Sequence, residues 1–168
     1  MLDRNLLADR WLAVDTETTG RGDGAEVVEL AVVDARGEVL FDSVIRPERR
    51  ISEGARRLHG LTAERLSKAP SFASLYEQVR KLIAGRILVA YCAPFDRRVL
   101  NASCRHAGLA EIPATWICAL DTYESLRGFR PPLHVACEIE SVQVPTQRHR
   151  AAADALALQR LIAGLRQV

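Results

Sequence analysis

Lysine is scarce in this chain of 168 residues. Of its 23 lysine and arginine residues, only Lys68 and Lys81 are lysines. Arginine suits bidentate contacts with phosphate, although codon bias in a GC-rich genome produces the same composition. The formal net charge is only +2, so overall charge neither requires nor excludes a nucleic-acid partner. Aromatic residues make up 5% of the chain, which argues against an extended stacking platform for long single strands.

Long apolar runs and closely spaced cysteine pairs are also missing. No segment reaches the roughly 20 apolar residues of a membrane helix, and "MLDRNLLADRW" at the N-terminus does not resemble a signal peptide. We therefore expect a cytoplasmic protein with no membrane partner. The chain has no C-x-x-C pair, so its cysteines do not suggest a disulfide or a zinc site. We expect buried free thiols in a reducing compartment. The four cysteines are Cys92, Cys104, Cys118 and Cys137.

Hydrophobic periodicity predicts one α/β domain, which we place at 8–168 after a short N-terminal segment at 1–7. Short turns join the first three strand patterns, so these should form an antiparallel meander. Later strands alternate with helices, which predicts a mixed sheet whose site lies at the carboxyl ends of its parallel strands. Strands are expected at 10–18, 26–35, 38–47, 86–91 and 115–120, and helices at 52–60, 71–85, 94–108, after 121, at 133–140 and at 151–165.

Two acids end the first predicted strand in "WLAVDTETTG", residues 11–20. Because side chains alternate along a strand, Asp15 and Glu17 share a face and Thr16 points away. Two carboxylates this close repel each other and raise each other's pKa unless a cation neutralises them. The pair therefore suggests a site for Mg²⁺ or Mn²⁺, which prefer oxygen ligands. A solvated strand end is the simpler alternative for an isolated D-x-E.

Three further candidates lie far along the chain. Asp96 should lie near the N-terminus of the helix after the fourth strand. An acid at this position also interacts favourably with the helix dipole, which is an alternative to a role in the site. His149 and Asp154 are five residues apart, so they converge only if His149 precedes the last helix and Asp154 lies in its early turns. The run 151–153 consists of alanines, whose small side chains let that helix approach the sheet.

The order of these motifs resembles the DEDDh group of 3′–5′ exonucleases, which includes the proofreading epsilon subunit of bacterial replicative DNA polymerase, ribonuclease T and oligoribonuclease. "AVDTETTG", "APFDRRVL" and "RHRAAADA" are similar to its three motifs, and "RLHGLT" to its loop after the third strand. The resemblance runs from Trp11 to Leu165. It implies a ribonuclease H-like α/β fold, a five-stranded mixed sheet flanked by helices.

The resemblance also implies a mechanism. Asp15, Glu17, Asp96 and Asp154 would be the four acids that hold two divalent ions, Mg²⁺ or Mn²⁺, about 3.5–4 Å apart. His149 would be the catalytic base that removes a proton from the attacking water, a role that suits an imidazole near neutral pH. A water would then cleave the terminal phosphodiester and release a nucleoside 5′-monophosphate.

The same resemblance places the terminal nucleotide. Backbone N–H groups near Thr18 and Thr19 would meet the 3′-hydroxyl, His59 and Leu61 would line the base pocket, and Phe95 would stack on a base. Core packing is the alternative for Leu61 and Phe95. Neighbouring arginines could bind phosphates, although solvated surface charge explains them equally well. These arginines are Arg97, Arg98, Arg148 and Arg150.

One departure concerns "YC" at Tyr91 and Cys92, where many members of the group have His-Asn; this puts local substrate contacts in doubt. The expected partner is a nucleic acid with a free 3′ end, DNA in preference to RNA. The chain would act alone or as a subunit joined to a DNA polymerase. Alternatives are an RNA-trimming exoribonuclease, a catalytically silent nucleic-acid-binding module and a two-metal phosphatase acting on small molecules.

Overall fold

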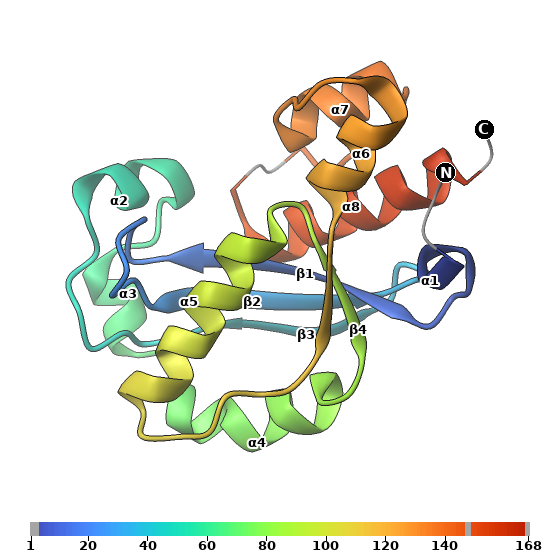
Figure 1. Ribbon diagram of the computed structural model, residues 1–168. Helices are drawn as coiled ribbons and strands as arrows, with labels where there is room; N and C mark the ends of the chain where they lie inside the picture. The colour runs from blue at the N-terminus through green and yellow to red at the C-terminus, as the bar shows by residue number, and fades with distance from the viewer. Residues whose placement is uncertain (1–3, 147–148, 167–168) are drawn as a thin grey trace.

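The computed structural model describes residues 4–146 and 149–166. Figure 1 shows a central sheet with helices on both sides. The strands are β1 (Trp11–Thr18), β2 (Val27–Asp34), β3 (Val39–Val44), β4 (Ile87–Ala90) and β5 (Thr115–Cys118). The helices are α1 (Arg4–Leu7), α2 (Glu53–His59), α3 (Ala63–Ser67), α4 (Phe72–Ile83), α5 (Ala93–His106), α6 (Ala119–Arg127), α7 (Leu133–Ile139) and α8 (Ala151–Leu165).

The strand order is β3-β2-β1-β4-β5. β1, β2 and β3 pair antiparallel, which confirms the predicted meander, and β4 is parallel to both β1 and β5. The tight β2–β3 turn uses Gly37 at φ 91°, and the Asp34 carboxylate accepts the N–H groups of Arg36 and Glu38. β1 and β4 therefore end at the same edge, where the sequence placed the site.

The two faces of the sheet are buried under different helices (Figure 1). On one face, Leu12 and Val14 pack with the apolar sides of α4 and α5. On the other face, Trp11 and Ala13 pack against α8. Ala151, the first residue of the predicted alanine run, and Ala155, one turn later, are fully buried there. Since large side chains are absent at these positions, the start of α8 lies close to β1 and β2.

Local signals placed most helix ends correctly. Ser52, Thr62 and Ser71 cap α2, α3 and α4, each with its side-chain oxygen accepting a backbone N–H. Gly60 ends α2 in the left-handed conformation at φ 71°. α6 differs from its prediction because it begins at Ala119, so Asp121 lies in its first turn.

The N-terminal region packs on the domain. Leu6 of α1 is fully buried, and its carbonyl accepts a hydrogen bond from Trp11 Nε1 at 3.2 Å. Arg166, after α8, pairs with Asp9 at 2.6 Å and lies over the Trp11 ring. The division between a 1–7 segment and a domain at 8–168 stays a prediction. Among the described residues, no helix combines the length and apolar character needed to cross a bilayer.

Candidate active site

The end of β1 carries acids on one face and a threonine on the other. Asp15 and Glu17 point to the α8 side, and Thr16 points to the α5 side, as strand alternation predicts. Glu17 pairs with Glu29 of β2 in the register of the sheet, and a bulge follows between Glu17 and Thr18. This edge therefore collects several carboxylates where β1 leaves the regular ladder.

Asp96 reaches the same edge from the first turn of α5. The helix begins at Ala93 with Pro94 in its first turn, and Asp96 is 5% exposed. The hydroxyl of Thr16 donates a hydrogen bond to Asp96 Oδ1 at 2.7 Å. The sequence correctly predicted that Thr16 points away from Asp15 and Glu17. It did not predict the hydrogen bond between Thr16 and Asp96.

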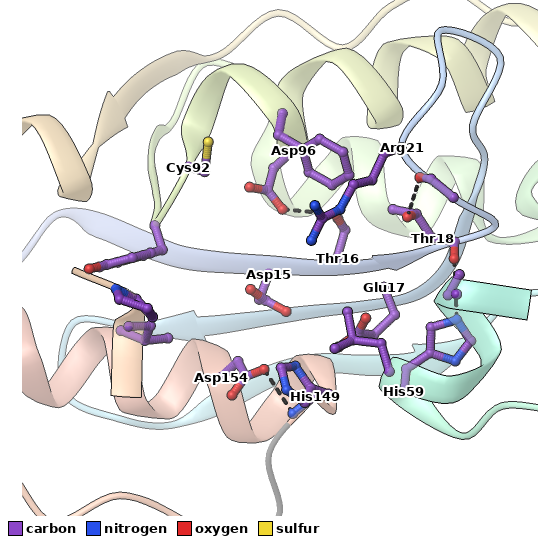
Figure 2. Close-up of a pocket in the computed structure, with 18 of the residues that line it drawn as sticks. Asp15, Thr16, Glu17, Thr18, Arg21, His59, Cys92, Asp96, His149 and Asp154 are labelled. Carbon is purple, nitrogen blue, oxygen red and sulfur yellow. Dashed lines mark hydrogen bonds between the residues drawn. The ribbon is translucent and has the colours of Figure 1, made fainter. Parts of the chain in front are cut away.

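His149 and Asp154 converge as the sequence required. His149 precedes α8, and Asp154 lies in the first turn of that helix. The backbone N–H of His149 donates to Asp154 Oδ2 at 3.1 Å. One ligand atom each from Glu17, His149 and Asp154 lie within 4.8 Å of one another. Figure 2 shows His149 and Asp154 below Asp15, Glu17 beside it and Asp96 above it.

Burial raises the pKa of these acids, and repulsion adds to the shift for Asp15 and Glu17. Burial raises the pKa of Glu17 to about 8, with Asp154 and Glu29 adding repulsion. Burial also raises the pKa of Asp96 to about 7, although the Thr16 hydrogen bond opposes the shift. The pKa of Asp15 lies well above its ordinary value because of burial and then of repulsion from Asp96, Asp154 and Glu17. Such a cluster of hard oxygen ligands fits divalent cations, which would offset this repulsion.

A cavity of about 970 Å³ surrounds the acids, at the upper end of the range of roughly 300–1,000 Å³ for small-ligand pockets. It has room for a terminal nucleotide. Among the described residues that line it, Arg21 is the one arginine or lysine. Leu58 and His134 also line it, and sequence reasoning had selected none of these three. The position of Arg21 in the loop directly after β1 was the only available signal.

The expected nucleotide contacts divide into two groups. Thr18, His59 and Phe95 line the cavity. Thr19 does not, because its N–H donates to Glu26 O at 2.9 Å and its hydroxyl accepts from Glu26 N. Leu61 is 1% exposed and packs with Val28 and Leu66, so its placement in a base pocket was wrong. Leu58, which is 46% exposed, faces the cavity instead.

His59 has a structural contact as well as a place in the cavity wall. Its Nδ1 accepts the N–H of Leu61 at 3.0 Å, so its Nε2 donates to Thr18 O at 3.2 Å. Burial lowers the pKa of His59 and favours this neutral form. His59 thus ties the end of α2 to the end of β1.

Two of the four candidate phosphate-binding arginines are engaged within the protein. Arg98 donates to the carbonyls of Arg21 and Gly22 and lies over the Phe95 ring. Arg150 pairs with buried Glu29. Arg148 lies outside the described residues.

The cysteines are free thiols, but not all of them are buried. Cys104 and Cys137 are buried, and Cys118 is partly buried. Cys92 is exposed and lines the cavity, so the expectation of burial was wrong for this residue. Cys92 precedes α5 at the point where the chain leaves β4, and this opens its side chain to the cavity.

Comparisons with known proteins show which family this chain resembles. The family model described as Exonuclease (RNase T) matches residues 12–162. An uncharacterized exonuclease, CP81, of Escherichia phage 186 is 31% identical over 162 residues, covering 88% of this chain and 84% of the phage protein. The structure of Exonuclease X in complex with 5′-overhanging duplex DNA is 27% identical with a TM-score of 0.72, covering 94% of this chain and 92% of that one.

The nuclease domain of 3′hExo, a DEDDh family member bound to rAMP, has the same fold. Its TM-score is 0.77 at 19% identity, and the match covers 95% of this chain and 92% of that one. The ribonuclease H-like five-stranded mixed sheet with flanking helices is thereby confirmed. With its D-x-E strand end, its α5 aspartate and its H-x-A-x-x-D helix start gathered around one cavity, the chain belongs to the DEDDh, or DnaQ-like, family of exonucleases.

Proposed function

We propose that this protein is a metal-dependent 3′–5′ exonuclease that releases nucleoside 5′-monophosphates, with DNA as the preferred substrate. The observation that carries the proposal is the meeting of buried carboxylates from β1, α5 and α8 with the His149 ring at one cavity. The similarity to Exonuclease X, whose structure contains duplex DNA, supports DNA as the substrate.

The four acids supply the ligands for two divalent cations, Mg²⁺ or Mn²⁺. Asp15 is central in this group, since Asp96, Asp154 and Glu17 all act on its charge. When bound, the cations would neutralise the carboxylates and polarise the scissile phosphodiester. The raised pKa values of Glu17 and Asp96 explain why the acids need such a partner at neutral pH.

His149 acts as the base. A ring nitrogen of His149 lies within 4.8 Å of carboxylate oxygens of Glu17 and Asp154, so the ring would reach a water held over these acids. The imidazole takes the proton as that water attacks the phosphorus, and the bond to the departing 3′-oxygen breaks in line. His149 comes from the segment before α8, so the base and one acid, Asp154, are set by the same helix start.

The cavity wall would hold the terminal nucleotide. Phe95 and Leu58 present apolar surface to a base, and stacking of this kind tolerates any sequence. Arg21 would contact a backbone phosphate, because its guanidinium adds positive charge at a cavity otherwise dominated by acids. Arg98 supports that contact by holding the carbonyls of Arg21 and Gly22.

The test uses 5′-labelled single- and double-stranded DNA and single-stranded RNA, with Mn²⁺, Mg²⁺ or EDTA. We expect ladders of shortened 5′-labelled strands, release of 5′-monophosphates and faster digestion of DNA. Glu17→Gln should abolish activity, and Glu64→Gln, an exposed acid on α3, should not. Activity that persists in EDTA, or loss of nucleotides from the 5′ end, would contradict the proposal. Faster digestion of RNA would assign the site to 3′-end trimming of RNA instead.

A catalytically silent nucleic-acid-binding module is the main alternative. Such a module needs no complete acid set, whereas here all four acids and His149 are present at one cavity. Digestion by the wild type, absent in Glu17→Gln, separates the two functions.

A further inference from the structure

A partly buried ion pair joins β2 to Arg150, the residue after the candidate base. Glu29 of β2 is 1% exposed and shares the α8 face of the sheet with Glu17, its register partner. A carboxylate this deeply buried is costly unless charge and hydrogen bonds compensate it. Both of its oxygens accept hydrogen bonds from Arg150 and Ala151 at the start of α8.

The donors belong to two consecutive residues. Arg150 Nε lies 3.0 Å from Glu29 Oε1 and 3.1 Å from Oε2, and Arg150 Nη2 also donates to Oε1. The backbone N–H of Ala151 donates to Oε2 at 3.1 Å. The hydrogen bonds with Glu29 raise the pKa of Arg150, whose guanidinium therefore stays charged. One carboxylate thus holds a side chain and a backbone group 121 and 122 residues away.

This contact fixes the backbone that carries His149. Arg150 is the residue before α8 and has no capping side-chain hydrogen bond of its own, so Glu29 provides the acceptor for the first helical N–H. His149, one residue earlier, has φ 56°, a left-handed conformation that is costly for a residue with a Cβ. Such a conformation persists only when the surrounding contacts impose it. Among the described residues, the Glu29–Arg150 pair flanks His149 on one side, and Asp154 accepts the His149 N–H on the other.

We infer that Glu29 and Arg150 are positioning residues, which hold His149 in the strained backbone conformation that aims its ring at the water site. The inference rests on the proposed function, in which His149 is the base. It assigns Arg150 a role inside the protein and not on the substrate backbone, because its guanidinium is committed to Glu29. It also couples β2 to the base without either residue touching the reacting atoms.

A double-mutant cycle on turnover tests the inference. Glu29→Gln removes the charge but keeps the shape and one acceptor, and it is made in the wild-type and His149→Ala backgrounds. Single-turnover rates with excess enzyme and Mn²⁺ give measurable values in the slow background. We expect Glu29→Gln to lower kcat by about 10- to 100-fold with little change in KM, as for other residues that orient a catalytic group. In His149→Ala the same substitution should cost less than about 2-fold, because there is no base left to position.

Glu140→Gln is the matched control. Glu140, at the end of α7, forms another bidentate pair, with Arg127 at 2.8 and 2.9 Å. Its substitution should lower the melting temperature without changing kcat in either background. Arg150→Lys is the second variant, for use if Glu29→Gln does not fold. It keeps the positive charge but loses the bidentate guanidinium contact, and it should show the pattern of kinetic changes expected for Glu29→Gln.

The outcomes separate the two levels of the argument. If Glu29→Gln and Arg150→Lys cost the same factor in both backgrounds, or if their effect appears in KM and in the salt dependence of binding, the positioning role is wrong. If the wild type digests no 3′ ends, or if His149→Ala is fully active, the proposed function itself fails. Thermal melts of every variant show whether a loss of activity reflects unfolding.

Discussion

The hydroxyl of Thr16 donates to Asp96 Oδ1 at 2.7 Å, although the two residues are 80 positions apart. Thr16 sits between the two acids of β1 but faces the other side of the sheet, where α5 delivers Asp96. One strand therefore supplies two carboxylates to the cavity and, from its opposite face, the hydrogen bond that orients another. The hydrogen bond favours the charged form of Asp96, whose pKa burial raises to about 7.

Substitution of Thr16 by valine should shift the pH dependence of activity. Without the hydroxyl, the pKa of Asp96 rises further, so a larger fraction is protonated near neutral pH and fewer acids are ready for cations. We expect Thr16→Val to lose more activity at pH 6.5 than at pH 8.5, and to need more Mn²⁺ for half-maximal rate. Thr16→Ser keeps the donor and is the control. Equal losses by both variants at both pH values would assign Thr16 to packing alone.

Stability without metal should fall as pH rises. Glu17 titrates near pH 8 in the folded chain and near its ordinary value of 4.5 when unfolded, and the pKa of Asp15 is raised as well. The folded state therefore binds more protons than the unfolded state between these values, and rising pH penalises folding across that window. We expect the melting temperature in EDTA to drop from pH 5 to pH 8.5, and Mn²⁺ to restore it mainly at the alkaline end.

Glu17→Gln gives this prediction an internal check. The neutral amide removes the titrating charge, so the variant should be more stable than the wild type in EDTA at pH 8.5 and should gain less from Mn²⁺. Glu64→Gln, on the exposed surface of α3, should follow the wild type in both respects. A melting temperature in EDTA that does not change with pH would show that the acids are solvated and not crowded.

Arg21 should matter for binding more than for turnover. If its guanidinium meets one phosphate, Arg21→Gln raises KM, leaves kcat nearly unchanged and reduces the slope of log affinity against log salt by about 0.7, the value for one phosphate of a single strand. Arg36→Gln, in the β2–β3 turn at the opposite end of the sheet, is the control. An unchanged salt slope in Arg21→Gln would exclude the phosphate contact.

His149→Ala should separate catalysis from metal binding. Loss of a positioned base costs about 10²- to 10⁴-fold in rate. The carboxylates remain, so the stabilisation by Mn²⁺ in thermal melts should persist. His106→Ala, whose ring lies next to Glu26 outside the cavity, should stay active. Full turnover by His149→Ala would refute the assignment of the base.

The sequence by itself determined most of the elements and which acids lie at one cavity. Ser52 and Gly60 cap the two ends of α2 through contacts within a few residues. The alternation of side chains along β1 determines which of them share a face. These features depend on local backbone geometry, which a short stretch of sequence specifies. The spacing of His149 and Asp154 was also informative, since a helix start has only one way to bring them together.

Only the tertiary structure decided which partner each side chain takes. Leu58 and Leu61 are both apolar residues near the end of α2, yet one lines the cavity and the other packs with Val28. Arg98 and Arg150 stand beside site residues in the chain, but their guanidinium groups hold protein carbonyls and Glu29. Periodicity gives the direction of a side chain, whereas the groups it meets come from distant segments, such as Glu29 and Ala151, which are 122 residues apart. The packing of α5 and α8 on the sheet brings such groups together.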